Sequence, residues 1–375
     1  MGASTAYHLS RRGITDVVVV ERESLLGAGS TGRNAGGVRH QFSQEANVRL
    51  SIESIRLFER FEEEVGAPID FHQDGYLFLL SDDATVERFE AQAAMQRRLG
   101  VDVRMLAPDE AARLAPGLAV EGVAGASFCA RDGIADPNGV TQGFARAAAA
   151  AGVTILRETE VTGVSTRSGR VTGVATSRGD IAAPLVVNAA GPWSAAVGRM
   201  AGLEVPVTPA RRHIFIATPP ATRPGDPPPV PPTRIMVIDF ESTFYFHREG
   251  DNVLFGMGDS SEVPTFDTTV QWDFLDRVIP VAVGRLPALA DSAISHAWAG
   301  LYEMTPDAMP VIGPAPGLDG FLLITGFSGH GFQHAPAAGR ILADVIAGRD
   351  PRVDLTPFSL GRFGQDGASA EATVV

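Results

Sequence analysis

Residues 2–21 read GASTAYHLSRRGITDVVVVE, and this stretch decides the fold class. Its first half carries good helix formers and stops at Gly13, a residue that suits the position after a helix C-terminus. Residues 16–21 form a β-branched run ending in an acid, which predicts a strand buried on both faces in a parallel sheet. Together they make the second half of a dinucleotide-binding βαβ unit, with Gly2 as its third glycine and Glu21 as the ribose-binding acid. The alternative is an ordinary helix–strand pair that binds no nucleotide.

The first half of such a unit does not appear in the pattern. We expect its first strand and first two glycines to lie before Met1, as in a chain with a start codon placed late or a chain that has been shortened. A chain that begins inside the unit would lose the tight turn of its phosphate-binding site.

A glycine-rich loop follows the predicted strand. Residues 27–37 read GAGSTGRNAGG and hold five glycines in eleven residues. Glycine lets the backbone approach a ligand closely and offer N–H groups to a phosphate. The alternative is a loop that is only flexible.

The remaining elements follow from hydrophobic periodicity and turn residues. The segment 219–232 is rich in proline and predicts an exposed loop or docking arm. The other expected elements are an amphipathic helix at 48–65, a strand at 75–80, a helix from 82 to about 99, a Pro/Gly-rich stretch at 108–125, a helix at 139–151 capped by Asn138, short strands between 153 and 188, a hairpin at 240–258, a strand at 321–325 and a helix at 336–347.

The composition excludes several chemistries. The chain has no lysine, so all 31 basic residues are arginines. A Schiff-base lysine, a phosphate-loop lysine and a lysine general base are therefore excluded, because arginine neither deprotonates nor acts as a compact cation. The 44 acidic residues give a net charge of −13 with no basic stripe, which argues against a nucleic-acid partner.

The chain has 375 residues, which suggests two domains or one large α/β domain. Its single cysteine, Cys129, excludes an internal disulfide framework and a multi-cysteine metal site. We expect no metal and a reducing, cytoplasmic location. No apolar stretch approaches the roughly 20 residues of a membrane-spanning helix.

Four segments, in this order, resemble the FAD-dependent amine oxidoreductases of the D-amino-acid oxidase superfamily. They are GSTGRNAGGVRHQFSQEANVRLS (29–51), DGYLFLL (74–80), WAGLYEMTPDAMPVIG (298–313) and GFSGHGF (326–332). The superfamily includes glycine oxidase, the sarcosine oxidases and the β subunit of archaeal L-proline dehydrogenase. QEANVRL, DGYLFLL and the Ala-Asp-Pro at 135–137 are most similar to the proline dehydrogenase and sarcosine oxidase β subunits.

The resemblance implies an α/β fold in which a Rossmann-like FAD-binding domain is interleaved with an antiparallel-sheet substrate domain. The FAD-binding domain is expected at 1–65, 130–210 and 305–365, and the substrate domain at 66–129 and 211–304.

The resemblance also implies contacts with FAD. Glu21 accepts the adenosine ribose hydroxyls, and the loop 326–332 lies against the isoalloxazine ring. There the N–H groups of a helix N-terminus would stabilise reduced flavin. The full set of expected cofactor-binding residues is Gly2, Glu21, Arg22, Ser30, Thr31, Gly36, Gly37, Val161, Ala190, Gly191, Gly329, His330, Gly331 and Phe332.

Five residues are expected at the substrate. Arg39 matches the arginine that holds a substrate carboxylate in monomeric sarcosine oxidase, and Gln333 stands where that enzyme has a second cation, a lysine. Tyr302 takes a flavin-facing position that carries an arginine in glycine oxidase, and Tyr245 and His330 complete the set. The alternatives are a surface ion pair for Arg39, a core position for Tyr302 and a structural role for His330.

Departures from the family pattern refine the expectation. Gly300 stands where related enzymes carry a flavin-linking cysteine, and no histidine lies near Arg33, so we expect non-covalent FAD. Leu254 aligns near the lysine that activates O2 in monomeric sarcosine oxidase, which disfavours rapid reduction of O2.

Three functions remain open. The first is a dehydrogenase that oxidises the C–N bond of a small amino or imino acid, such as sarcosine, proline or glycine. It would pass electrons to another flavin, a partner subunit or a quinone. The second is an oxidase that releases hydrogen peroxide, and the third is a shortened remnant that binds FAD poorly.

Overall fold

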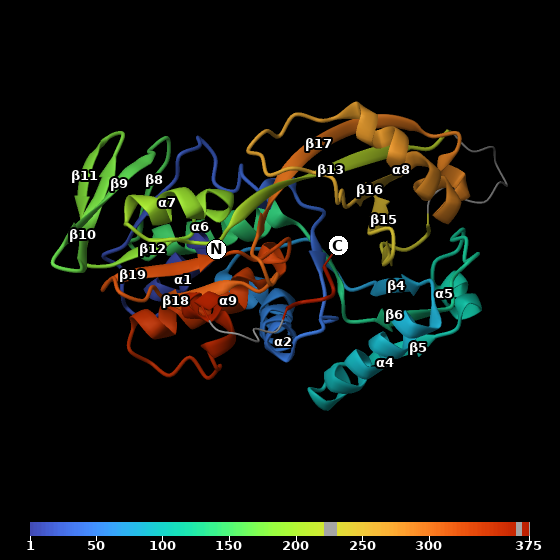
Figure 1. The fold of residues 1–375 in the computed structure, drawn as a ribbon, viewed down its shortest axis with the longest axis horizontal. Helices are drawn as coiled ribbons and strands as arrows, with labels where there is room; N and C mark the ends of the chain where they lie inside the picture. The colour runs from blue at the N-terminus through green and yellow to red at the C-terminus, as the bar shows by residue number, and fades with distance from the viewer. Residues whose placement is uncertain (221–230, 365–369, 375) are drawn as a thin grey trace.

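The computed structural model describes residues 1–220, 231–364 and 370–374. Most of the proline-rich segment predicted as an exposed loop or docking arm lies outside the described residues. Figure 1 shows two halves joined by long strands, one half built on small sheets and helices and the other on a large sheet. None of the described helices is long and apolar enough to cross a bilayer.

The helices within the described residues are α1 (Gly2–Ser10), α2 (Glu45–Glu59), α3 (Phe61–Val65), α4 (Asp83–Arg98), α5 (Pro108–Leu114), α6 (Pro137–Ala150), α7 (Ser194–Met200), α8 (Trp272–Arg285) and α9 (Gly331–Ile346). The strands are β1 (Val18–Val20), β2 (Gly37–Val38), β3 (Phe71–His72), β4 (Tyr76–Leu80), β5 (Val103–Leu106), β6 (Gly125–Cys129), β7 (Gly133–Ala135), β8 (Thr154–Leu156), β9 (Val161–Arg167), β10 (Arg170–Thr176), β11 (Gly179–Ala182), β12 (Val186–Asn188), β13 (Thr208–Thr218), β14 (Met236–Asp239), β15 (Phe244–Glu249), β16 (Asn252–Met257), β17 (Ala293–Met304), β18 (Val311–Pro314) and β19 (Phe321–Thr325).

The predicted helix–strand unit is present at the N-terminus. After α1, strand β1 pairs in parallel with β8, which confirms the parallel arrangement. The prediction that this strand is buried on both faces is wrong, since Val18 is 39% exposed. β8 is the one strand that pairs with β1 among the described residues, so β1 does not lie inside a wide sheet.

Helix α1 packs between α6 and α9. Gly339 of α9 lies so close to α1 that a Cβ atom there would fall on the Ser4 hydroxyl. The Ser4 hydroxyl in turn donates to the Ala335 carbonyl across the same contact, at 2.8 Å. Beside these helices, β12 and β19 pair in parallel and β18 adds an antiparallel edge.

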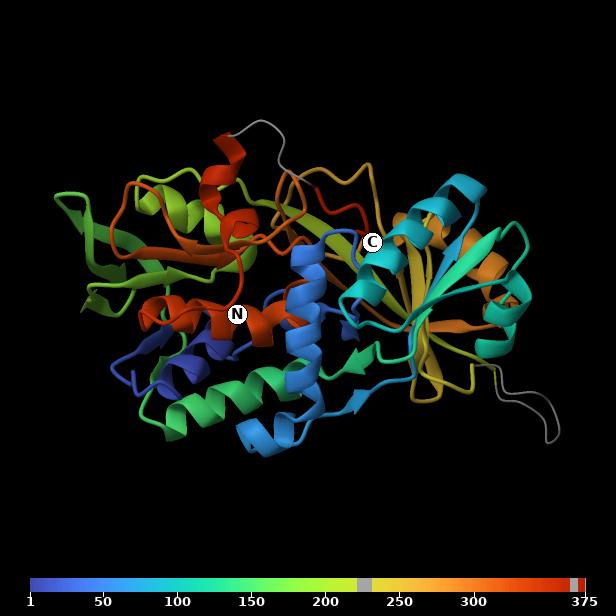
Figure 2. The same ribbon diagram turned by 90° about the horizontal axis from the view of Figure 1, so that it is seen from below.

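The second half is an eight-stranded sheet of order β17-β13-β16-β15-β14-β4-β6-β5, in which β14 and β4 form its one parallel pair among the described strands. Alternation along β4 divides the core between the two faces of the sheet. Leu77 and Leu79 pack with the cluster that holds residues of α5 and α8, whereas Tyr76 and Phe78 pack with Phe89 of α4. Figure 2 shows this sheet edge-on with helices on either side.

Two local predictions are corrected. The helix predicted at 139–151 begins at Pro137, and its N-cap is Asp136, whose carboxylate accepts the Asn138 and Gly139 N–H groups. Helix α9 begins at Gly331 and contains Pro336, although the sequence predicts a start at that proline. The Pro/Gly-rich stretch contains α5.

Candidate active site

The turn between β19 and α9 carries the GFSGHGF segment. Gly329 has φ +94°, and a Cβ atom there would fall on the Tyr302 ring, so only glycine lets this loop lie against the tyrosine. The first N–H groups of a helix have no partner within the helix. Because the N-cap His330 makes no side-chain capping bond, the start of α9 presents donors and a positive dipole end.

A second helix N-terminus lies next to this one. Met1 is the N-cap of α1, without a side-chain capping bond, and its Cε lies 3.7 Å from the Cβ position of Gly331. The Glu303 carboxylate lies 3.5 and 3.6 Å from the Cβ positions of Gly331 and Gly191. Three of the predicted cofactor-binding residues therefore lie around the Glu303 carboxylate, namely Gly2, Gly191 and Gly331.

Glu303 is the acidic group at this place. Burial raises its pKa, and the hydroxyl of Thr325 donates to it at 2.9 Å. Two helix N-termini lined by glycine offer unpartnered N–H groups, which suit the phosphates of a dinucleotide. The residues present here therefore fit a dinucleotide such as FAD.

The other predicted cofactor-binding residues lie along the same half. Glu21 follows β1, and its Oε1 accepts the N–H of Glu23 at 2.9 Å. The Arg22 guanidinium lies 4.5 Å above the Trp193 ring. The Ser30 hydroxyl donates to the Leu301 carbonyl at 2.6 Å and so ties its loop to β17.

Four more of the predicted cofactor-binding residues can be placed by the element in which they lie. Thr31 begins a short 3-10 turn, Val161 is the half-buried first residue of β9, Ala190 precedes Gly191, and Phe332 lies in the first turn of α9. Gly36 and Gly37 allow close protein contacts. A Cβ on Gly36 would lie 3.1 Å from the Ile134 side chain, and one on Gly37 would fall on the Tyr76 hydroxyl.

Arg39 follows β2 and is buried, with 2% of its surface exposed. Its Nη2 donates to the Thr373 carbonyl at 2.6 Å, and its Nη1 donates to the Gln41 carbonyl. The ring of Phe42 lies 4.0 Å from the guanidinium carbon. The Arg39 backbone N–H donates to Gln333 Oε1 at 2.7 Å, so the two residues predicted to share a substrate carboxylate are neighbours. The alternative of a surface ion pair for Arg39 is wrong.

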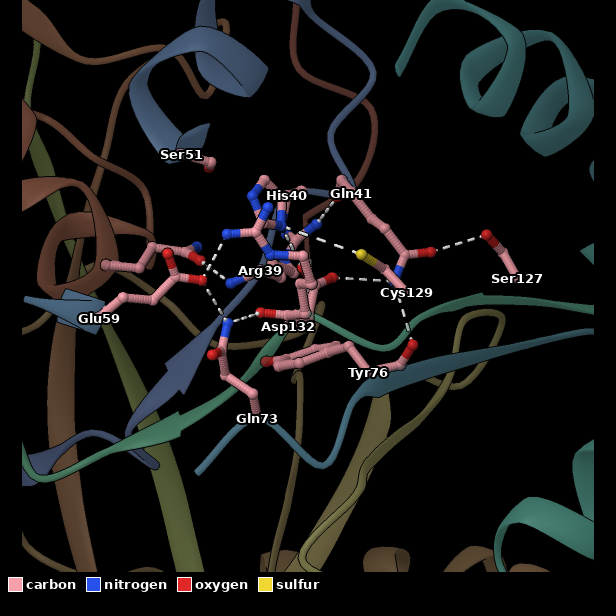
Figure 3. A network of polar contacts seen from close by, with 12 residues as sticks. Arg39, His40, Gln41, Ser51, Glu59, Gln73, Tyr76, Ser127, Cys129 and Asp132 are labelled. Carbon is pink, nitrogen blue, oxygen red and sulfur yellow. Dashed lines mark hydrogen bonds and ion pairs between the residues drawn. The ribbon is translucent and has the colours of Figure 1, made fainter. Parts of the chain in front are cut away.

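A hydrogen-bond network holds the two residues that follow Arg39, His40 and Gln41 (Figure 3). Asp132 accepts the His40 N–H at 2.8 Å, His40 Nδ1–H at 2.6 Å and Gln41 Nε2–H at 3.1 Å. The thiol of Cys129 lies 3.9 Å from His40 Nδ1. His40, Cys129 and Asp132 bring possible ligand atoms within 4.8 Å, but the short His40–Asp132 bond organises them as a hydrogen-bond network.

Three tyrosines and a second arginine lie near Arg39. Tyr76, Tyr245 and Tyr302 come from β4, β15 and β17, and burial raises the pKa of each, so all three are protonated at neutral pH. The Arg212 guanidinium lies 5.1 Å from the centre of the Tyr302 ring. Arg212 and Arg39 both lower the pKa of Tyr302 against the effect of burial, which places Tyr302 within the field of two cations.

Two buried histidines lie behind Arg39. His330 packs edge-on against Phe42 at 4.9 Å, and the ring of His334 lies 5.0 Å from Phe42. Burial, reinforced by the charge of Arg39, holds both histidine pKa values well below the ordinary value. Both rings are neutral, and they leave the positive charge of Arg39 undiminished.

The sequence patterns did not identify Arg212, Tyr76, Glu303 or Thr373. Arg211 and Arg212 are adjacent in β13, so their side chains point to opposite faces. Arg211 bonds Glu262 and Asp267, while Arg212 faces Tyr302. The alternation along β13 predicts that one of the two arginines points to each face of the sheet. Which face meets the active site depends on the pairing of β13 with β17, which the sequence pattern does not give.

The model of the family described as "FAD dependent oxidoreductase" matches residues 1–345. The human "Sarcosine dehydrogenase, mitochondrial" is 31% identical over 97% of this chain, and the chain spans 40% of that relative's length. "FAD-dependent oxidoreductase domain-containing protein 1" of Xenopus laevis is 32% identical, with 100% of this chain and 83% of the relative covered.

Solved structures agree with these relatives. The crystal structure of L-proline dehydrogenase from P. horikoshii superposes with a TM-score of 0.87 at 35% identity, covering 96% of this chain and 94% of that one. The resemblance carried by the four sequence segments is thereby confirmed, as is the prediction of an α/β fold of the FAD-binding type. The chain therefore belongs to the FAD-dependent oxidoreductase family.

Proposed function

We propose that this protein is a FAD-dependent dehydrogenase that oxidises the C–N bond of a small amino or imino acid, with sarcosine, proline and glycine as the leading candidates. One observation carries the proposal. Arg39 and Arg212 form no direct ion pair with a carboxylate among the described residues, and they flank the buried tyrosines beside the start of α9. Arg39 is buried and Arg212 is half-buried. Cations withdrawn from water without a partner anion favour an anionic ligand, such as the carboxylate of an amino acid.

FAD supplies an acceptor for the hydride that leaves the carbon next to the substrate nitrogen. We propose that residues 1–65, 130–210 and 305–365 hold it without a covalent link, with Glu21 at the adenosine ribose and the start of α9 at the flavin. The segments 66–129 and 211–304 would form the walls of the substrate site. Gly300 supports the non-covalent link, since it offers no nucleophile.

Arg39 is proposed as the main carboxylate anchor, with Gln333 beside it and Arg212 as a second cation. Tyr245 and Tyr302, protonated at neutral pH, would donate hydrogen bonds to the substrate. His330 is neutral and has no hydrogen-bond partner for Nε2 among the described residues, which supports a structural role more than one as a base. Loss of hydride from the carbon next to a neutral amine needs no strong base.

We propose a non-O2 electron acceptor, either a quinone, another flavin or a partner subunit. Leu254 of β16 is buried, and the chain offers no lysine to activate O2 there. The relatives called sarcosine and dimethylglycine dehydrogenase are more than twice as long as this chain, which supports the use of further domains or subunits. The single buried thiol supports a reducing, cytoplasmic location.

The decisive experiment is anaerobic reduction of the bound flavin. Purified holoprotein is mixed with sarcosine, dimethylglycine, proline and glycine, and loss of the oxidised flavin band is followed. At least one of these amino acids should bleach the flavin, whereas a matched 2-hydroxy acid should not. Bleaching by none of the amino acids would refute the proposal, and stoichiometric O2 uptake during turnover would replace the dehydrogenase with an oxidase.

A further inference from the structure

The C-terminal segment Ala370–Val374 lies across the candidate active site. In two perpendicular views the C-terminus lies between the two halves of the molecule (Figures 1 and 2). Glu371 is 4% exposed and Thr373 is 1% exposed, so these two side chains are buried, whereas Ala370 and Ala372 are exposed.

Glu371 binds the N-terminal end of α2. Its carboxylate accepts the N–H and hydroxyl of Ser43 at 2.8 and 2.6 Å, the N–H of Gln44 at 3.1 Å and the amide of Asn47 at 2.9 Å. An acid at a helix N-terminus is stabilised by the unpartnered N–H groups and by the helix dipole. Gln44, the N-cap of α2, makes no side-chain cap of its own, so Glu371 takes that role from about 330 residues away.

Thr373 reaches the carboxylate anchor. Its carbonyl accepts Arg39 Nη2–H at 2.6 Å, and its hydroxyl donates to Gln92 Oε1 of α4 at 3.4 Å. The N–H of Ala372 donates to the Ser43 hydroxyl at 2.8 Å. The segment therefore joins α2, α4 and Arg39.

The segment offers Arg39 a hydrogen-bond acceptor and a nearby negative charge, which are two features that a substrate carboxylate combines in one group. Glu371 is one of the negative charges that raise the pKa of Arg39 against burial, and the other acid, Asp132, is already bonded to His40. The Thr373 carbonyl supplies a hydrogen-bond acceptor at the guanidinium itself. The segment is held by these polar contacts, and its side chains include no large apolar anchor.

We propose that the segment Ala370–Val374 is an exchangeable occupant of the Arg39 subsite, which competes with the substrate carboxylate and must leave Arg39 before an amino acid binds. The proposal rests on the proposed function, because Arg39 serves a substrate only there. A site closed for about nine tenths of the time binds its ligand with an apparent Kd about tenfold above the intrinsic value.

The test uses holoprotein and the probe pyrrole-2-carboxylate, a carboxylate without an oxidisable C–H next to nitrogen. Its Kd is measured from the change in the flavin spectrum. Glu371→Gln and a chain ending after residue 369 should both bind the probe about tenfold more tightly than the wild type. The matched control is Glu45→Gln, which removes an acid from the same helix end but contacts Arg49 in an exposed pair, and should not change the Kd.

Hydrogen exchange of the backbone amides supplies an independent readout. Saturating probe should release the protected amides of residues 371–373 in the wild type. Unchanged or weaker probe binding in both tail variants with a native flavin spectrum, or unchanged amide protection under saturating probe, would overturn the proposal. These outcomes are separate from the proposed function, which fails only if no amino acid reduces the flavin.

Discussion

Arg39 combines deep burial with a charge that no direct ion pair neutralises among the described residues. Its Nη1 and Nη2 each donate to a main-chain carbonyl, and the Phe42 ring covers one face. Neutral carbonyls satisfy N–H groups but leave the charge in place, so an incoming carboxylate gains more here than it would at an exposed arginine.

Arg39→Ala should therefore raise KM for the amino acid by about tenfold to a hundredfold, because a charge-assisted hydrogen bond contributes about 1.5–3 kcal/mol. The effect on kcat should be smaller, since the carboxylate is bound equally in the ground and transition states. Steady-state kinetics with an artificial electron acceptor measure both constants. Arg131→Ala, which breaks an exposed pair with Glu59, is the control, and an unchanged KM would remove Arg39 from this role.

His8 makes the stability of the fold depend on pH. It is buried in α1, where desolvation and the charges of Arg12 and Arg340 lower its pKa to about 3 against the opposing effect of Asp344. In the unfolded chain its pKa is near 6.5, so below that pH the unfolded state binds a proton that the native state does not. Stability should fall as pH drops from about 6.5 towards 3.

The expected loss from His8 is about 2 kcal/mol between pH 6.5 and 5, at 1.36 kcal/mol per pH unit. Urea unfolding at pH 7.5 and 5 should show that His8→Gln loses about that much less stability than the wild type on acidification. His296→Gln, at an exposed position, should behave like the wild type. Equal acid sensitivity of the His8 variant and the wild type would contradict the expected shift.

At the scale of elements, the contact between α1 and α9 depends on one glycine. A Cβ on Gly339 would fall on the Ser4 hydroxyl and lie 2.8 Å from the Ser4 carbonyl carbon. Because the second of these atoms belongs to the backbone of α1, the two helices would have to move apart to make room. Gly339→Ala should lower the free energy of unfolding by about 1–3 kcal/mol, as overpacking does. Gly284→Ala in α8, where no atom lies within 4 Å of the Cβ position, should raise it by about 0.5–1 kcal/mol. Chemical denaturation of both variants measures the contrast, and a neutral Gly339→Ala would mean that the helices lie further apart.

Most helices and strands could be predicted from the sequence because hydrophobic periodicity and turn residues are encoded within each segment. The strand at 75–80, the helix after Ser81 and the hairpin in 240–258 all appear close to their expected positions. Helix α9 begins before the expected proline, because buried residues such as His334 stabilise a turn that propensity alone disfavours. Asp136 and Asn138 are both good caps, and only the path of the chain decides between them.

The candidate site was predicted less completely, for a reason that belongs to the whole molecule. Motifs identified Arg39, Tyr302 and Gln333, which lie within single segments. Arg212 enters through the pairing of β13 with β17, and Thr373 contacts Arg39 across more than 330 residues. No local pattern encodes such long-range contacts, so they emerge only from the packed fold.

The expected FAD site also combines segments that are far apart in the sequence, so FAD should stabilise the folded protein as a whole. A ligand that binds only the native state adds about 2.7 kcal/mol at a concentration of 100 Kd. FAD is expected to contact Glu21 at one end and the start of α9 at the other, whereas FMN lacks the adenosine and cannot reach Glu21.

Glu21→Gln should weaken FAD binding about tenfold, by the loss of one charge-assisted hydrogen bond, and leave FMN binding unchanged. Thermal melts of the apoprotein with each flavin measure the difference. Glu23→Gln, at the neighbouring exposed acid, is the control, and an equal FAD shift in Glu21→Gln and the wild type would place the adenosine elsewhere.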